Sequence, residues 1–98
     1  MDLGLKDKCA LVLASSAGLG KAIATEFARE QANVMLFSPF EDELKSAQAE
    51  ILKLTGKEPS YFCGDITNPE DIKKLVEVTV AKYGPIYALV NNTGGPPA

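Results

Sequence analysis

The sequence predicts an α/β fold in which four short strands alternate with three helices, in the order β-α-β-α-β-α-β. Two observations support this prediction. Short, continuous apolar runs recur along the chain, and longer segments with apolar residues three or four apart separate them. Glycine, proline, asparagine or serine stands at most of the junctions. Alternation at this spacing predicts a parallel sheet with right-handed crossovers, which is half of a doubly wound sheet.

The predicted strands are the four apolar runs, at residues 9–14, 34–37, 61–63 and 86–90. The first run contains no charged residue and no residue with a strongly polar side chain. A strand that is apolar on both faces is typical of a parallel sheet covered by helices on both sides. We therefore expect the strands to form a buried middle layer.

The first predicted helix follows the first strand. Its residues Leu19, Ile23 and Phe27 lie four apart and predict one buried face. Asn33 is the expected left-handed residue at the end of this helix. Three alanines are expected to widen the same face, namely Ala22, Ala24 and Ala28.

The second predicted helix begins at a serine. Ser38 is expected to cap it, with Pro39 at the first helical position and Glu41 completing a capping box. Gly56 is expected to end it. The residues expected to be buried are Leu44, Ala47, Ile51 and Leu54.

The third predicted helix begins at Asn68, which is expected to cap it, and Pro69 follows at the first helical position. Gly84 is expected to end it. The residues expected on its inner face are Ile72, Leu75, Val76, Thr79, Val80 and Tyr83.

The composition is that of a soluble globular domain. The chain has 98 residues, of which 46% are hydrophobic and 23% charged, and its net charge is −3. No block of like charge predicts a nucleic-acid or membrane-surface partner. The apolar runs are too short for a transmembrane helix or a signal peptide, so we expect a cytoplasmic protein. Histidine is absent, which excludes histidine-dependent metal sites and serine– or cysteine–histidine relays in this segment, and we expect no metal-binding residues.

The two cysteines, Cys9 and Cys63, are expected to be small buried residues in a reducing compartment. The second strand is expected to lie between the strands that carry them. The resulting lateral separation of about 10 Å excludes a disulfide bond between the two thiols.

The loop at residues 15–20, Ser-Ser-Ala-Gly-Leu-Gly, joins the first strand to the first helix. Glycines let the backbone approach a bulky anion, and the first N–H groups of a helix point at it, so the loop predicts a pyrophosphate site. An ordinary strand-to-helix turn would explain the same residues. A P-loop does not fit, because Ser15 and Ala22 stand where its first glycine and its last serine or threonine belong.

Residues 8–24 resemble the opening of the short-chain dehydrogenase/reductase family, whose loop is Thr-Gly-x-x-x-Gly-x-Gly. Gly18 and Gly20 match the second and third glycines of this motif. Leu13 and Ala14 stand where its threonine and first glycine belong. An alanine is suitable there only if its φ is negative.

Two further segments match the family at its usual intervals. Asp65 and Ile66 resemble its aspartate–aliphatic pair, and residues 91–94, Asn-Asn-Thr-Gly, resemble its Asn-Asn-Ala-Gly motif. The resemblance covers essentially the whole chain. It implies that residues 1–98 form a partial Rossmann fold, the NAD(P)-binding half-domain of a reductase of about 250 residues.

The resemblance also implies a role for each matched position. The residues expected to hold the pyrophosphate and the adenosine ribose are Ser15, Ser16, Gly18, Leu19 and Gly20. Asp65 would accept a hydrogen bond from the adenine amino group, and the Ile66 backbone N–H would donate one. Asn91 would lie near the ribose, and Gly94 would let the backbone pass close to the coenzyme. A solvated acid, a polar strand end and an ordinary turn glycine are the alternative explanations of Asp65, Asn91 and Gly94.

The end of the second strand is expected to distinguish NADP from NAD. An acidic residue there binds the ribose hydroxyls and repels a 2′-phosphate. Ser38, which is neutral, falls at this place, whereas Pro39 and Ala17 supply none of the basic charge common in NADP-binding relatives. We expect NADP to be preferred over NAD, although a helix cap would also explain Ser38.

The family carries its catalytic serine and Tyr-x-x-x-Lys pair beyond the fourth strand, and no substitute occurs in this chain. None of Tyr61, Tyr83 and Tyr87 precedes a lysine at the required spacing. We therefore expect no catalytic residue here, only dinucleotide binding. The whole enzyme would be a homo-oligomer that transfers a hydride between nicotinamide and a small carbonyl or alcohol substrate, keto-acyl thioesters being one family substrate.

Two other functions are compatible with the sequence. One is a non-catalytic nucleotide-binding module built on this half-fold. The other is a protein-interaction remnant that acts through the open edge of the sheet, which residues 86–90 are expected to form.

Overall fold

The chain folds into four strands and three helices. In chain order they are β1 (Cys9–Leu13), α1 (Gly18–Arg29), β2 (Asn33–Ser38), α2 (Glu41–Thr55), β3 (Ser60–Cys63), α3 (Pro69–Tyr83) and β4 (Ile86–Val90). The computed structural model describes residues 4–91. All four strands are parallel, in the order β3-β2-β1-β4. The predicted fold class is confirmed, and every strand begins and ends within one residue of its prediction.

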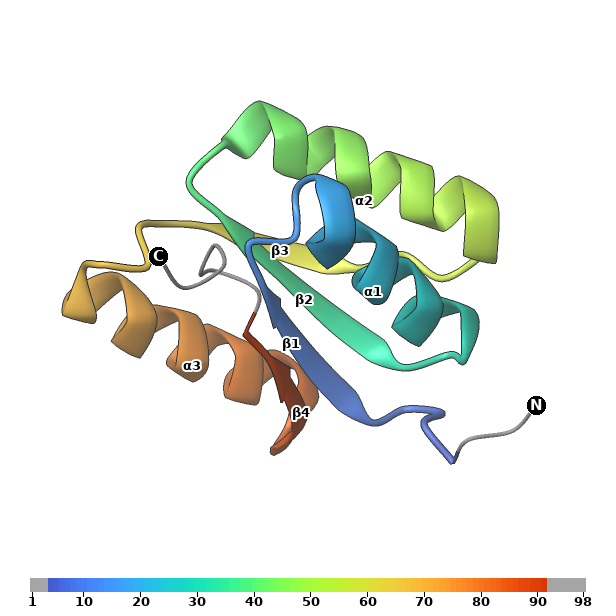
Figure 1. Cartoon of the computed structure of the whole chain (residues 1–98). Helices are drawn as coiled ribbons and strands as arrows, with labels where there is room; N and C mark the ends of the chain where they lie inside the picture. The colour runs from blue at the N-terminus through green and yellow to red at the C-terminus, as the bar shows by residue number, and fades with distance from the viewer. Residues whose placement is uncertain (1–3, 92–98) are drawn as a thin grey trace, which may run out of the picture.

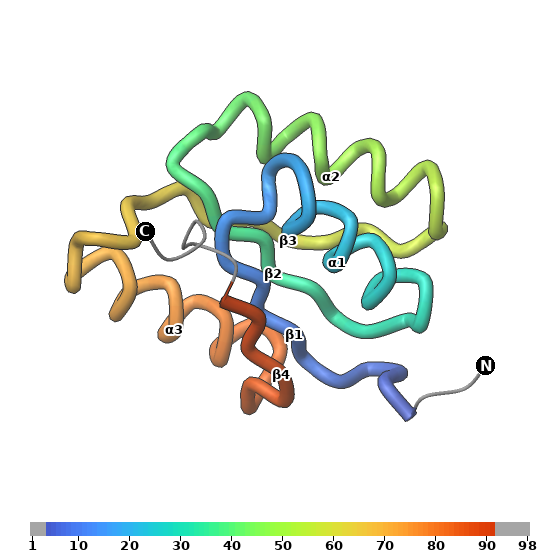
Figure 2. Tube along the Cα trace, viewed as in Figure 1, coloured from blue at the N-terminus to red at the C-terminus, as the bar shows by residue number. Residues whose placement is uncertain are grey.

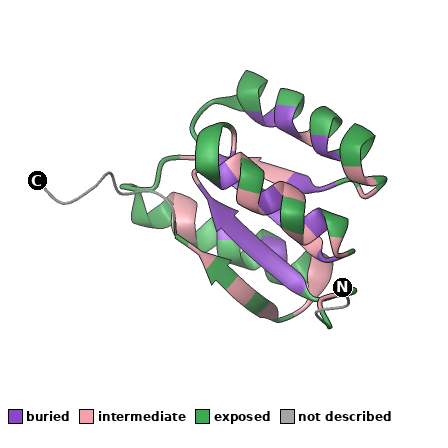
Figure 3. Cartoon of the chain, turned by 45° about the vertical axis from the view of Figure 1, so that its right-hand side comes forward, coloured by how far each residue is buried: buried purple, intermediate pink, exposed green. Residues whose placement is uncertain are grey.

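Two apolar clusters hold the helices to the sheet, with α1 and α2 on one face and α3 on the other (Figure 1). The cluster under α1 and α2 contains Val12, Ala24, Ala28, Ala32, Val34, Leu36, Leu44, Ala47 and Ile51. The cluster beside α3 contains Leu11, Leu13, Met35, Phe37 and Leu75. Successive side chains of a strand point to opposite faces, so β1 and β2 supply both clusters. Their burial on both faces matches their continuous apolar sequences (Figure 3).

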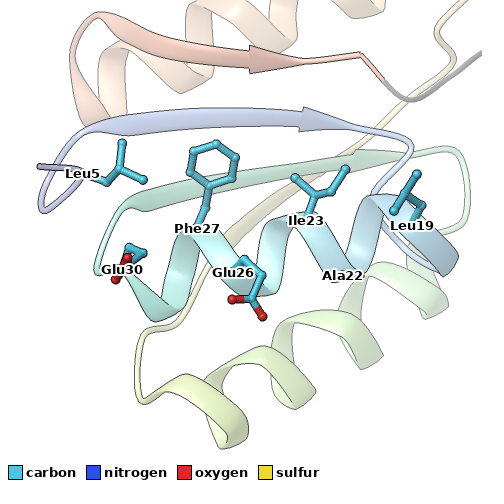
Figure 4. Close-up of a pocket in the computed structure, with 7 residues that line it drawn as sticks. All are labelled: Leu5, Leu19, Ala22, Ile23, Glu26, Phe27 and Glu30. Atoms are coloured by element: carbon cyan, nitrogen blue, oxygen red, sulfur yellow. The ribbon is translucent and has the colours of Figure 1, made fainter. Parts of the chain in front are cut away.

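Helix α1 buries only part of the predicted face: Ala24 and Ala28 are buried, as expected, but Ala22 is exposed. Leu19 is 65% exposed, and Ile23 and Phe27 are only half-buried. The buried residues of α1 are Gly20, Ala24 and Ala28. Small residues at these positions let the helix lie close to the sheet, where larger side chains would not fit. The larger side chains therefore lie in a row along one flank of the helix (Figure 4).

A hollow of about 470 Å³ runs along this flank. Within the part of the chain that the structure describes, its lining comes from α1 and the segment before β1. The lining residues are Leu5, Leu19, Ala22, Ile23, Glu26, Phe27 and Glu30 (Figure 4). The hollow is mainly apolar and runs along α1 from Leu19, in its first turn, to Glu30, directly after its last residue.

Two helix boundaries differ from the prediction. Gln31, with φ 66°, is left-handed after α1, whereas Asn33 begins β2. Helix α2 begins at Glu41 and its N-cap position is Phe40, so Ser38 is not its cap and no capping box forms. Ser38 ends β2 instead and is 2% exposed, because it packs against the loop that follows β1.

The other helix boundaries agree with the prediction. Gly56, with φ 77°, ends α2 in the left-handed conformation. The Asn68 side chain accepts a hydrogen bond from the Glu70 N–H (2.9 Å) at the start of α3, and Gly84 follows its last turn. Three residues predicted to be buried are exposed instead: Leu54, Val76 and Val80.

Strand β4 forms one edge of the sheet, as expected for residues 86–90. Its Tyr87 and Leu89 side chains are 61% and 62% exposed, and intermediate and exposed residues alternate along it (Figure 3). Among the described residues, no strand pairs with its outer side. No helix in this part of the chain is long and apolar enough to cross a membrane.

The two cysteines have different environments. Cys9 is buried in β1, as predicted, but Cys63 is exposed, because it is the last residue of the other edge strand, β3. Both thiols are free. Strand β2 lies between β1 and β3, as expected, and keeps the two thiols apart.

Candidate functional site

The loops after β1, β2 and β3 meet at the carboxyl ends of the strands (Figure 2). Open parallel sheets bind their ligands at this edge. Residues on all three loops were selected from the sequence, and the strand order β3-β2-β1 makes these loops neighbours. We therefore treat this edge as the candidate site.

The loop between β1 and α1 has two left-handed residues, Ala14 (φ 54°) and Gly18 (φ 61°). The condition given for an alanine at position 14, a negative φ, is therefore not met. A Cβ atom on Gly18 would meet no atom within 4 Å, so there is space for a side chain. Glycine is favoured there because its backbone adopts a positive φ without strain. A Cβ atom on Gly20 would overlap the carbonyl oxygen of Ala14, so glycine there lets α1 pack against the loop.

The N-terminus of α1 is open. Ala17 at its N-cap provides no side-chain hydrogen bond, and no acidic residue lies in the first turn. By contrast, Asn68 caps α3, and acidic side chains occupy the first turn of α2. The first amides of α1, including those of the exposed Gly18 and Leu19, are therefore available to an anion, which the helix dipole also attracts.

Ser15 is buried and connects this loop to β2. Its hydroxyl accepts a hydrogen bond from the Phe37 N–H (2.8 Å), and its own N–H donates to the Phe37 carbonyl oxygen (3.0 Å). With its side chain 0% exposed, Ser15 supports the loop and presents no hydroxyl to a ligand.

Ser16 and Ser38 lie in contact, although 22 positions separate them. Their Oγ atoms are 2.9 Å apart. Ser16 Oγ also donates a hydrogen bond to Glu43 Oε1 (3.2 Å), and the Phe40 N–H donates to Ser38 Oγ (3.1 Å). Glu43 was not found from the sequence, because no local pattern on α2 indicates that it faces the β1–α1 loop.

A small hollow of about 170 Å³ opens beside these serines. It is lined by Ala14, Phe37, Ser38, Pro39 and Ile66. Two residues selected from the sequence for separate reasons, Ser38 and Ile66, thus share one hollow at the ends of β2 and β3. Its mainly apolar lining suits a flat ring with polar edges.

Asp65 is held in a tight turn. Its Oδ1 accepts hydrogen bonds from the Thr67 N–H and the Thr67 hydroxyl, both at 2.8 Å. These two hydrogen bonds hold the pKa of the Asp65 carboxyl below its usual value. The Asp65 N–H donates to Asp71 Oδ2 (2.9 Å), a support that the sequence did not reveal. At neutral pH the exposed carboxylate can therefore only accept hydrogen bonds.

The last two expected residues lie at the end of β4. Asn91 is exposed directly after this strand, which pairs with β1, so it belongs to the same edge of the sheet. Gly94 lies outside the described residues.

These features define a class of fold. A parallel sheet with the order β3-β2-β1-β4, helices on both faces and a glycine-containing turn after the central β1 is part of a Rossmann fold. The family model for the short chain dehydrogenases matches residues 8–98. The chain belongs to the short chain dehydrogenase family.

Individual relatives agree with this assignment. The chain is 35% identical over 94 residues to the 7alpha-hydroxysteroid dehydrogenase of Escherichia coli (strain K12), covering 96% of this chain and 36% of that enzyme. It is 37% identical over 87 residues to the glucose 1-dehydrogenase of Gluconobacter oxydans (strain 621H), covering 89% and 33%. The chain thus spans about a third of the length of these curated relatives.

A solved structure has the same fold. The L-sorbose reductase of Gluconobacter frateurii, complexed with NADPH and L-sorbose, superposes with a TM-score of 0.90 at 34% identity. The match covers 97% of this chain and 36% of the reductase. A metagenomic short-chain oxidoreductase in complex with NADP gives a TM-score of 0.86 at 28% identity, covering 93% and 41%.

Proposed function

We propose that this chain is the dinucleotide-binding half of an NAD(P)-dependent oxidoreductase. The observation that carries the proposal is the open N-terminus of α1 at the carboxyl edge of the sheet, next to a small hollow between the loops after β2 and β3. The uncapped amides suit a pyrophosphate. The hollow suits the adenosine, which is covalently joined to the pyrophosphate.

The proposed contacts involve the amides at the start of α1 and the residues around the small hollow. The amides of Gly18, Leu19 and Gly20 bind the pyrophosphate, while Ser15 holds the loop in place. Ile66 packs beside the adenine ring in the small hollow and donates its N–H to the ring. The Asp65 carboxylate accepts from the adenine amino group, because its lowered pKa keeps it charged.

The remaining proposed contacts are to the riboses. Ser16 and Ser38 approach the adenosine ribose, and Asn91 and Gly94 pass close to the coenzyme. NADPH and NADP are the ligands in the two related structures. They support NADP as the coenzyme of this chain, with NAD as the second possibility.

The reaction of the parent enzyme is also proposed. When bound, the nicotinamide supplies or accepts a hydride, and the substrate is a small carbonyl compound or alcohol, as the dehydrogenase and reductase relatives suggest. The described tyrosines do not favour proton transfer at the site. Tyr83 Oη lies 2.6 Å from Ser60 Oγ at the start of β3, and Tyr61 and Tyr87 are the second residues of β3 and β4. Tyr87 lies toward the amino end of β4, and Tyr61 packs against the apolar cluster under α1 and α2.

The binding proposal is tested by titrating this chain with NADPH and NADH in a calorimeter. The critical variant is Gly18→Val, whose side chain would project into the open space in front of the α1 amides. Gly56→Val is the matched control, because Gly56 has a similar φ of 77° and equally open surroundings but precedes β3 at the opposite edge. Circular dichroism checks that both variants fold.

We expect Gly18→Val to abolish binding, and Gly56→Val to retain it despite similar backbone strain. Unchanged affinity in Gly18→Val would remove the phosphate-binding role of the loop. If titration of the unaltered chain with NADPH and with NADH gives no heat of binding, a protein-interaction role would be favoured instead. A reading frame that continues past residue 98 into a Tyr-x-x-x-Lys sequence would support the catalytic parent, and a stop codon there would favour a binding module.

A further inference from the structure

The hydroxyl hydrogens of Ser16 and Ser38 are both used in hydrogen bonds within the protein. An ionised carboxylate only accepts hydrogen bonds, so the Ser16 hydrogen is directed to Glu43 Oε1. Ser16 Oγ then accepts from Ser38, which itself accepts from the Phe40 N–H. The result is a chain of hydrogen bonds in one direction, from Phe40 through Ser38 and Ser16 to Glu43.

The charge around this series of hydrogen bonds is negative. Glu43 lies in the first turn of α2 together with Glu41 and Asp42. The lysine on the facing turn of α1, Lys21, forms an ion pair with Glu50 (2.6 Å) further along α2. Among the described residues, the ion pairs of the structure leave Glu43 without a basic partner.

We propose that Glu43 is a specificity-determining residue of the dinucleotide site, acting against a phosphate at the 2′ position of the adenosine ribose. Ser38 lines the small hollow, and its Oγ is linked through Ser16 Oγ to the Glu43 carboxylate. A group bound next to Ser38 therefore meets serine lone pairs, with a negative charge one hydrogen bond behind them. A free 2′-hydroxyl can donate to these acceptors. A 2′-phosphate needs donors and is repelled. Glu43 thereby supplies from α2 the acidic charge that position 38 lacks, and it reduces the advantage of NADP over NAD.

This inference rests on the proposed function, so the experiment tests both dinucleotide binding and the role of Glu43. Four probes are titrated: NADH, NADPH, 5′-ADP and 2′-phospho-ADP, the members of each pair differing by the 2′-phosphate alone. The variants are Glu43→Gln, which keeps an oxygen to accept from Ser16, and Glu41→Gln. The second variant is the matched control, because it removes the same charge from the same helical turn.

We expect Glu43→Gln to raise the affinity for NADPH and 2′-phospho-ADP about fivefold relative to their partners, and Glu41→Gln to change these ratios much less. Added salt should shrink the difference, because it screens exposed charges. This salt dependence separates a direct electrostatic role from a structural one. Melting temperatures confirm that both variants are folded.

The contrary outcomes are distinct. Two results would overturn the role of Glu43 while leaving dinucleotide binding intact. One is an equal change in affinity for both members of each pair in Glu43→Gln, and the other is the same change in the affinity ratio in Glu41→Gln. Failure of all four probes to bind the unaltered chain would overturn the proposed function, and this inference with it.

Discussion

Ala14 shows at the scale of one residue how this loop departs from its family pattern. Its φ of 54° lies in the left-handed region, which disfavours a side chain with a Cβ atom, and the family places a glycine there. The carbonyl oxygen of Ala14 also contacts Gly20, so the residue cannot relax without moving α1. The loop keeps its shape, and the alanine bears the strain.

Ala14→Gly is therefore expected to stabilise the chain. The strain of about 1–2 kcal/mol exceeds the entropic cost of a glycine in the unfolded chain, about 0.4–1 kcal/mol. We expect the free energy of unfolding, measured with urea, to rise by about 0.5–1 kcal/mol. Ala17→Gly is the control, because Ala17 is extended (φ −156°) and relieves no strain. An Ala14→Gly variant no more stable than Ala17→Gly would show that the alanine is unstrained.

The two thiols should differ in reactivity. Burial raises the pKa of the Cys9 thiol, so Cys9 stays protonated and unreactive, whereas Cys63 is exposed. With a thiol reagent near neutral pH, we expect one cysteine to react at once and the second only after denaturant is added. Cys63→Ser should abolish the fast phase. A fast phase that survives in this variant would mean that β1 opens readily.

At the scale of the element, α1 illustrates why helix periodicity alone misplaces a buried face. Two stripes run along the helix, one of large residues and one of small ones, and both have helical spacing. The hydrophobic pattern favours the stripe with Leu19, Ile23 and Phe27. The structure buries the small stripe, because close approach to the sheet requires it.

A substitution in the stripe of small residues should therefore destabilise the chain more than one in the stripe of large residues. Ala24 is 0% exposed against the sheet, so Ala24→Leu is expected to overpack this contact and cost about 1–3 kcal/mol. Ile23→Ala removes a half-buried side chain and is expected to cost about 1 kcal/mol. Thermal or urea unfolding compares them. A larger loss in Ile23→Ala than in Ala24→Leu would place the buried face where the hydrophobic pattern had it.

At the scale of the whole molecule, the strand order decides where a ligand can enter. One crossover leaves β1 toward β2 and β3, and the chain later returns to place β4 on the other side of β1. The strand order therefore reverses its direction at β1, and open parallel sheets bind their ligands outside the carboxyl ends of the strands at such a point. Those residues selected from the sequence that the structure describes lie at this edge because each of them ends a strand or follows one.

The sequence predicted much of the fold because its signals are local. Continuous apolar runs marked the strands, and Asn68, Gly56 and Gly84 marked helix boundaries that the structure confirms. The candidate site was predictable where a residue follows a strand, as Ile66 and Gly18 do. Glu43 and the burial of Ser15 were not predictable, because each depends on a contact with a residue more than twenty positions away.

The amino-acid sequence by itself determined the alternation of strands and helices, the parallel sheet and the open glycine-containing turn, since periodicity and backbone preference act over a few residues. Tertiary structure alone decided which flank of α1 is buried, that Ser15 supports the loop, and that a carboxylate from α2 reaches the two serines. These features depend on how closely α1 and α2 approach the sheet and each other. That approach is set by the packing of side chains from distant parts of the chain.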